Sequence, residues 1–208
     1  MIRIILLLAV SVLLGACAGS QVTRVQALSE TADAPYGNIL VISLFKSFDG
    51  RRYHEKEIVK QLTASGISAV ASTSLMNTKT PMTRKTFLDM VEKLDSDAVL
   101  ITRLVDLDTT VKVKDANPEA THIIRPTYYY NVWSVELTEF VGPQDMQTKS
   151  TLILSTQLYS VSTREPVWSI ESKTKLTRDY QTRGDTSFII DEAKQVAKYM
   201  SKDGLISP

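Results

Sequence analysis

The segment 38–44 has the sequence NILVISL, and its pattern is the starting point for predicting the fold. The run is apolar and rich in β-branched residues, and it lacks the alternation of a half-exposed strand. This pattern predicts a strand that is covered on both faces. The segment 97–105, DAVLITRLV, has the same character and predicts a second, mostly buried strand. Two such strands separated by helical patterns indicate an α/β protein.

The chain between these strands predicts two helices and a short strand. The first helix is expected over 51–65, with Asp49 as its N-cap and Gly66 as its left-handed stop. A short strand is expected over 67–72, and Thr83 is the expected cap of the next helix. Apolar residues recur at helical spacing in both helices, as Ile58, Val59 and Leu62 and as Phe87, Met90, Val91 and Leu94. The order β-α-β-α-β with right-handed crossovers predicts that the helices lie on one face of a mixed sheet.

The second half of the chain predicts an antiparallel meander and a final helix. The stretch 106–124 is polar and is expected to be a loop. Strands are expected over 125–141, 151–161 and 166–176, with Trp133 and Trp168 on the core side. The last helix is expected after Asp185 or Thr186, ending at Gly204, with Ile189, Ala193, Val196 and Met200 on its apolar stripe. The predicted fold class is α/β (α+β mixed), β-α-β-α-β followed by a meander and a C-terminal helix, with helices packed on a mixed sheet.

The amino terminus has the pattern of an export signal. Residues 1–16 combine Arg3 with a short apolar run, which is too short for a membrane-spanning helix. The tetrapeptide at 14–17, LGAC, resembles the lipobox of bacterial lipoproteins, and it contains the only cysteine of the chain. The resemblance implies that Cys17 carries a lipid; a plain secretory signal or a core cysteine is the alternative. Alanine and glycine at 18–19, where inner-membrane lipoproteins have aspartate, imply the outer membrane, facing the periplasm.

The expected domain organisation follows from this signal. Residues 1–16 are the predicted lipoprotein signal peptide, and residues 17–36 are the predicted lipidated cysteine and flexible tether. Residues 37–208 are the predicted single periplasmic α/β domain. The whole chain has 208 residues, is 43% hydrophobic and carries a formal net charge of +1. These values argue against disorder and against a nucleic-acid binder, and one cysteine excludes a disulfide framework.

The inventory of reactive residues predicts a protein that is not an enzyme. His54 and His122 stand outside any metal-binding or catalytic motif, and both are expected at the surface. The acidic pairs at 95/97 and 106/108 are expected to be solvated residues at strand ends. No cofactor and no metal site is expected. Tyr128 and Tyr130 should point away from the core, where they either contact a partner or are covered by another element of the chain.

Several short segments together resemble a group of periplasmic lipoproteins. They are the lipobox, the strand-helix opening, 94–101 (LDSDAVLI) and the hairpin 158–168 (LYSVSTREPVW). The chain resembles the group of the curli-secretion lipoprotein, the penicillin-binding-protein activator lipoprotein and the TolB amino-terminal domain. That group often has glycine at the position of Arg164. The resemblance implies a mixed α/β fold and a role in binding other envelope proteins or in forming oligomers.

We therefore expect a lipid-anchored periplasmic protein that recruits or regulates an envelope complex. Cell-wall synthesis, secretion and polysaccharide export are the machineries considered. The expected partner is another envelope protein or a second copy of the chain, and not a nucleic acid. Two alternatives stay open, an envelope hydrolase and a carrier of a small apolar ligand.

Overall fold

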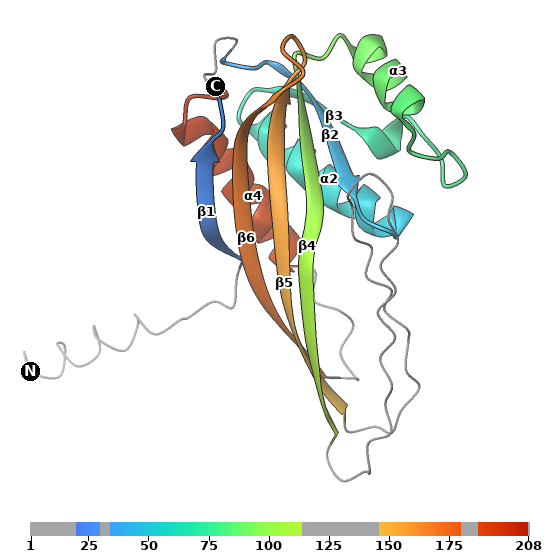
Figure 1. The fold of residues 1–208 in the computed structure, drawn as a ribbon, viewed down its shortest axis with the longest axis vertical. Coiled ribbons are helices and arrows are strands. Elements are labelled where there is room, and N and C mark those ends of the chain that lie inside the picture. The colour runs from blue at the N-terminus through green and yellow to red at the C-terminus, as the bar shows by residue number, and fades with distance from the viewer. Residues whose placement is uncertain (1–19, 30–33, 114–145, 180–186, 208) are drawn as a thin grey trace, which may run out of the picture.

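A computed structural model describes residues 20–29, 34–113, 146–179 and 187–207 of the chain (Figure 1). The described elements are, in order, β1 (Gln21–Ala27), β2 (Asn38–Leu44), α2 (Phe48–Ala64), β3 (Ser68–Ala71), η2 (Ser72–Ser74), α3 (Arg84–Leu94), β4 (Ala98–Val113), β5 (Met146–Ser160), β6 (Pro166–Asp179) and α4 (Ser187–Lys202). They confirm the predicted mixed α/β class, with helices packed on a mixed sheet and a C-terminal helix.

The six strands form one sheet in the order β1-β6-β5-β4-β2-β3. Strand β2 pairs in parallel with β3 and with β4, and the other neighbours are antiparallel. Residues Ile39–Ile42 of β2 are at most 1% exposed, as their unbroken apolar run predicted. The sheet therefore has a parallel half, built by helical crossovers, and an antiparallel half, built by a hairpin and the N-terminal strand.

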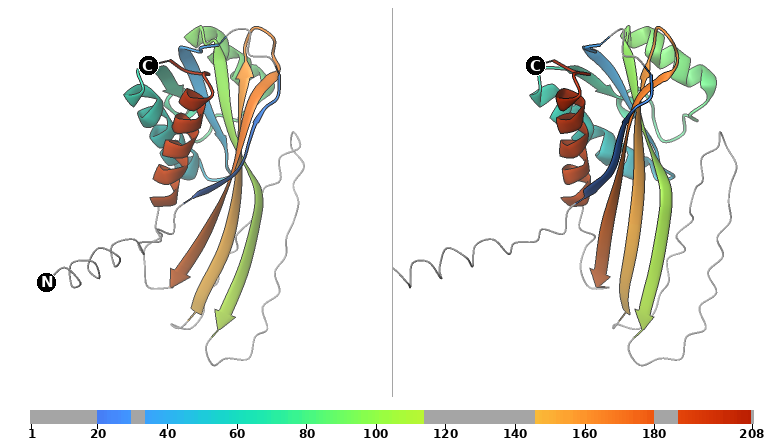
Figure 2. Two further views of the ribbon diagram at one scale, coloured as in Figure 1. Left: turned by 90° about the vertical axis from the view of Figure 1, so that its left-hand side faces the viewer. Right: turned by 60° about the vertical axis from the view of Figure 1, so that its left-hand side comes forward.

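The helices cover both faces of the sheet, so the prediction that they share one face is wrong. The side chains of Ile39 and Val41 lie in a core with α2 and α4, whereas those of Leu40 and Ile42 lie in a second core with α3. Figure 2 shows α3 on the side of the sheet opposite α2 and α4. The cause is the strand order: the crossover from β2 to β3 and the crossover from β3 to β4 run in opposite directions across the sheet. Two crossovers of the same hand then lie on opposite faces.

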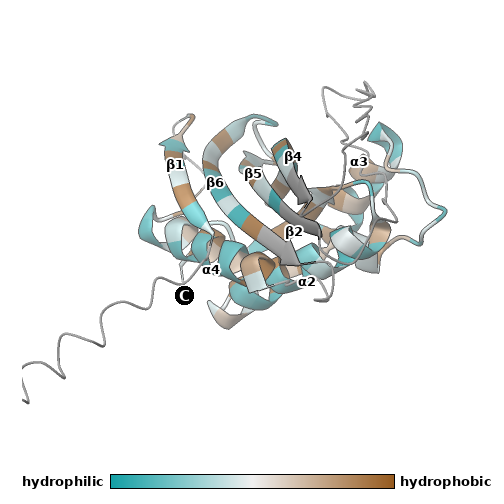
Figure 3. Ribbon diagram, turned by 90° about the horizontal axis from the view of Figure 1, so that it is seen from below, coloured by the Kyte–Doolittle hydropathy of each residue, from teal (hydrophilic) through white to brown (hydrophobic). Residues whose placement is uncertain are grey.

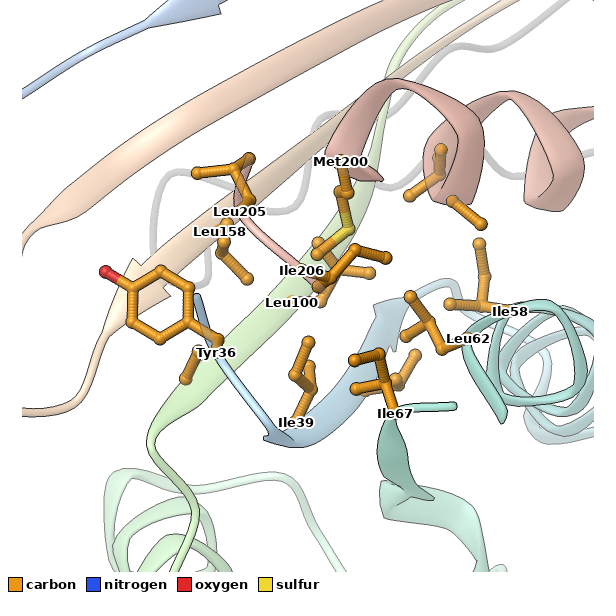
Figure 4. Close-up of a cluster of buried hydrophobic side chains, with 14 of the residues drawn as sticks. Tyr36, Ile39, Ile58, Leu62, Ile67, Leu100, Leu158, Met200, Leu205 and Ile206 are labelled. Carbon is orange, nitrogen blue, oxygen red and sulfur yellow. The ribbon is translucent and has the colours of Figure 1, made fainter. Parts of the chain in front are cut away.

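The larger core lies between the sheet and the pair α2 and α4 (Figure 4). It joins Ile58 and Leu62 of α2, Met200 of α4, and Leu100 and Leu158 of the sheet. Trp168 is 1% exposed in this core, as predicted, and its Nε1 donates a hydrogen bond to Asp203 Oδ2 at 2.8 Å. The core thus ties the last helix to the antiparallel half of the sheet.

The predicted helix ends agree with the structure at three of the four described positions, and the predicted cap at Asp185 or Thr186 lies outside the described residues. The Thr83 side chain accepts from the backbone N–H of Thr86 in a capping box, and Gly66 and Gly204 have positive φ angles of 81° and 71°. The predicted N-cap Asp49 is wrong, because α2 begins one turn earlier and Ser47 caps it. A serine hydroxyl fills this position as well as a carboxylate does.

Two segments predicted to lack regular structure belong to the sheet. The prediction of a flexible tether over 18–36 is wrong for Gln21–Ala27, which pair with β6 as strand β1. The predicted loop over 106–124 is wrong as far as Val113, because β4 continues to that residue alongside β5. As a result, β4, β5 and β6 run together well past the ends of the helices (Figures 1 and 2). The predicted strand 125–141 and its Trp133 lie outside the described residues.

Candidate functional site

The antiparallel half of the sheet has one face that no described helix covers. Figure 3 shows α2 and α4 on one side of the sheet, while the other side of β5 and β6 faces away from them. The pairing register aligns two rows of side chains across this open face. One row runs from Arg24 through Glu171 and Ser155 to Arg103. The next row contains Gln26, Ser169 and Gln157.

These rows line a hollow of about 190 Å³, which we call the sheet groove. Its polar walls are formed by Arg24 and Gln26 of β1, Arg103 of β4, Ser155 and Gln157 of β5, and Ser169 and Glu171 of β6. Strands spaced about 4.8 Å apart bring these side chains together although they are far apart in the sequence. Seven of the nine lining residues are polar or charged, so the groove is suited to a polar ligand.

The two arginines of the sheet groove have no carboxylate partner among the described residues. None of the described ion pairs includes Arg24, Arg103 or Glu171. The Nε of Arg103 is buried and has no hydrogen-bond partner there. The positive charge of Arg103 is thus not neutralised by a described carboxylate, and an arginine guanidinium readily accepts an anionic partner at its terminal NH2 groups. The groove therefore has an electrostatic preference for an anion at Arg103.

Other groove side chains are held in place by local hydrogen bonds. The Tyr159 hydroxyl donates to Gln157 Oε1 at 2.8 Å, which leaves the NH2 group of Gln157 free to donate to another acceptor. The Thr23 hydroxyl donates to Glu171 Oε1 at 3.3 Å. These contacts orient one amide and one carboxylate beside the two arginines.

A second feature attaches the N-terminus to the body of the domain. Ser20 is buried, and its hydroxyl donates to Glu192 Oε2 of α4 at 2.7 Å. Burial raises the pKa of the Glu192 carboxyl, and the hydroxyls of Ser172 and Ser20 limit this rise. Together with the pairing of β1 and β6, this contact fixes the chain from Ser20 onward.

The prediction that His54 lies at the surface is wrong, because its side chain is fully buried. His54 Nδ1 lies 2.8 Å from Ser43 Oγ, and the ring meets Phe45 edge-on at 5.0 Å between centroids. Burial lowers the pKa of His54 from 6.5 to about 4, since the charged ring would lose its hydration. The ring is therefore neutral at physiological pH.

The neighbouring Glu55 is also fully buried, and it accepts three hydrogen bonds. Ser43 N and the Ser72 hydroxyl donate to Oε1 at 2.8 and 2.9 Å, and Thr73 N donates to Oε2 at 2.8 Å. Ser43 itself is 0% exposed, so its hydroxyl and the His54 ring have no access to a substrate in this structure. The Ser43–His54–Glu55 cluster joins α2 to β2 and to the turn after β3, which is a structural role.

The other predicted site residues divide into two groups. Cys17, Tyr128, Tyr130 and His122 lie outside the described residues. Asp97 is described, and its carboxylate accepts from the backbone N–H of Gly37 at 2.7 Å and of Asn38 at 3.1 Å. Asp95 ends α3 with a left-handed φ of 50°. Asp106 and Asp108 are exposed on β4, in agreement with the expectation of solvated side chains.

The described residues offer no support for a metal centre or a membrane-spanning helix. No group of three or more His, Cys, Asp or Glu side chains within them is arranged to hold a metal ion. No helix in the described ranges has both the length and the apolar character needed to cross a bilayer.

Comparisons with known proteins find distant likenesses to solved structures. No protein-family model matches the chain, and no curated protein matches its sequence significantly. The PelC dodecamer from Paraburkholderia phytofirmans is similar at 15% identity and a TM-score of 0.42, over 89% of this chain and 98% of that one. Lipoprotein GNA1162 from Neisseria meningitidis is similar at 9% identity and a TM-score of 0.41, over 80% and 99%. A minor lipoprotein from Acinetobacter baumannii is similar at 10% identity and a TM-score of 0.38, over 83% and 96%.

Proposed function

We propose that this chain is a lipid-anchored, non-enzymatic binding protein of the bacterial outer membrane that faces the periplasm. In this role it recruits or regulates an envelope complex, through another envelope protein or a second copy of itself. The lipobox at 14–17 supports the anchor, and the residues at 18–19 support the outer membrane.

The observation that carries the proposal is the burial of Ser20 against Glu192. Ser20 stands three residues after Cys17, and three residues span at most about 10–11 Å. A lipid on Cys17 would therefore hold the folded domain directly at the bilayer surface. A domain held this close to the bilayer is suited to act on partners in or near the same membrane. It is less suited to capture diffusing substrates.

The buried polar cluster supports binding over catalysis. Its serine and histidine are the only described pair that resembles a nucleophile with its base, and both side chains are 0% exposed. The polar side chains that line the sheet groove include no histidine or cysteine.

The anchor is tested by labelling cells with radioactive palmitate and fractionating their membranes. The parent should be labelled and should sediment with the outer membrane, whereas Cys17→Ser should be unlabelled and released. A labelled or membrane-bound Cys17→Ser variant would contradict the anchor.

The binding role is tested by crosslinking intact membranes and isolating the tagged lipoprotein, with a second, differently tagged copy in the same cells. Recovery of an envelope protein or of the second copy is expected, and its recovery should fall when a ten-residue Gly-Ser segment is inserted before Ser20. The same insertion placed in the exposed turn at 77–80 is the matched control. Equal recovery from all three proteins would show that the distance from the membrane is irrelevant.

A further inference from the structure

We propose that the sheet groove binds the carboxylate of an acidic sugar, with Arg103 as the anion-binding residue. The groove is a described hollow on the open face of the sheet, and its site is independent of the lipid anchor. The proposal goes beyond the proposed function because it names a class of ligand. It rests on the proposed function in one respect, that the protein and the glycan are both in the cell envelope.

The first step is the positive charge of Arg103, which no described carboxylate pairs. The Nε of Arg103 is buried without a partner among the described residues. A planar guanidinium binds a carboxylate through parallel hydrogen bonds, which are stronger than bonds between neutral groups. Arg103 is therefore suited to an anionic group that enters the groove from solvent.

The second step is the chemistry of the surrounding walls. Gln26 and Gln157 carry amides that both donate and accept, and Ser155 and Ser169 carry hydroxyls that do the same. Glu171 adds an acceptor beside Arg24 in the same row. Sugar hydroxyl groups also donate and accept, so this set matches a ring with several hydroxyls and one carboxylate.

The third step separates a sugar from a protein partner. The centre of a protein–protein interface is normally apolar and aromatic. The only apolar residues that line the groove are Leu28 and Ile170, and Ile170 is buried in the opposite core. Leu28 is thus the one exposed apolar side chain of the lining, and the other accessible walls are polar, which favours a hydroxylated acid over an apolar peptide side chain.

The test is a titration of the full-length lipoprotein in detergent micelles with a galacturonic acid tetramer. The matched ligands are a neutral galactose tetramer and a tetrapeptide of aspartate. We expect saturable binding of the galacturonate, weakened by salt because the contact is charged. Binding of the neutral sugar with equal affinity, or of the peptide alone, would overturn the proposal, and so would no binding of the galacturonate.

The variants test the assignment of Arg103. Arg103→Gln keeps a polar side chain of similar length, and we expect it to weaken binding about 10- to 100-fold. Arg24→Gln changes an exposed residue of the same row and provides a second variant if Arg103→Gln fails to fold. The control is Arg52→Gln on α2, whose side chain pairs with Asp49 on the far side of the sheet. Unchanged affinity in both folded groove variants would overturn the proposal, while palmitate labelling of Cys17 would report separately on the anchor.

The same titration with a muramic acid derivative distinguishes between the cell wall and an acidic polysaccharide as the source of the ligand. Stronger binding of this sugar than of the galacturonate would assign the groove to the cell wall. The reverse order would assign it to an acidic polysaccharide. Both results support a carboxylated sugar.

Discussion

Acidification should destabilise the domain through His54. The folded pKa of this ring is about 4, against an ordinary value of 6.5, because burial disfavours the charged form. The stability that the neutral ring contributes is thus present above pH 6.5 and is lost as the pH falls towards 4. Each pH unit between these two pKa values lowers the free energy of unfolding by about 1.4 kcal/mol, so the full loss is about 3 kcal/mol. Roughly 2 kcal/mol of it should already be lost at about pH 5.

The measurement is urea unfolding of the parent and of His54→Asn at a series of pH values between about 7 and about 5. The asparagine amide can replace His54 Nδ1 as the partner of Ser43, but it does not titrate. We expect the free energy of unfolding of the parent to fall more steeply with acid than that of the variant, by about 2 kcal/mol. Parallel slopes for the parent and His54→Asn would refute the reasoning.

Three further changes test the core, the hairpin and the N-terminal attachment. Trp168→Ala should lower the free energy of unfolding by about 3–5 kcal/mol, because it empties a fully buried site; a urea midpoint equal to that of the parent would contradict this packing. Arg164 has a left-handed φ of 62°, so Arg164→Gly should raise stability by about 1 kcal/mol in thermal melts. The pKa of Glu192 is raised, so its contribution is present below the ordinary value of 4.5 and is lost as the pH rises. Glu192→Gln should remove that loss, and an unchanged fall in the free energy of unfolding as the pH rises above 4.5 would argue against the buried carboxyl.

The elements that the sequence predicted well are those whose pattern is set by burial. Strand β2 and the apolar stripe of α3 pack into the two hydrophobic cores, so their hydrophobic residues alone predict them. Trp168 was placed correctly because its strand alternates between the core and the exposed lysines at 173 and 175. Arg164 has a positive φ, a backbone conformation that glycine adopts without strain.

The missed elements have weaker local signals. Only Val22 and Val25 of β1 pack on the core, and a bulge between Val22 and Arg24 breaks the period of two. The burial of His54 had a usable signal, because it stands four residues before Ile58 and eight before Leu62 on one helical face. The sheet groove had no such signal, since Arg24 and Arg103 are placed in one row only by the register of four strands.

The contact between Ser20 and Glu192 has a consequence for the order of folding. The two residues are 172 positions apart, so an early segment of the domain docks on a helix that is synthesised much later. Closing a loop of this length costs conformational entropy before its contacts form, and contacts of large sequence separation slow folding. Strand β1 cannot join the sheet until β6 exists as its neighbour. The N-terminal end of the domain is therefore the last part to become fixed, and we expect refolding to show a late phase in which this end acquires its protection from hydrogen exchange.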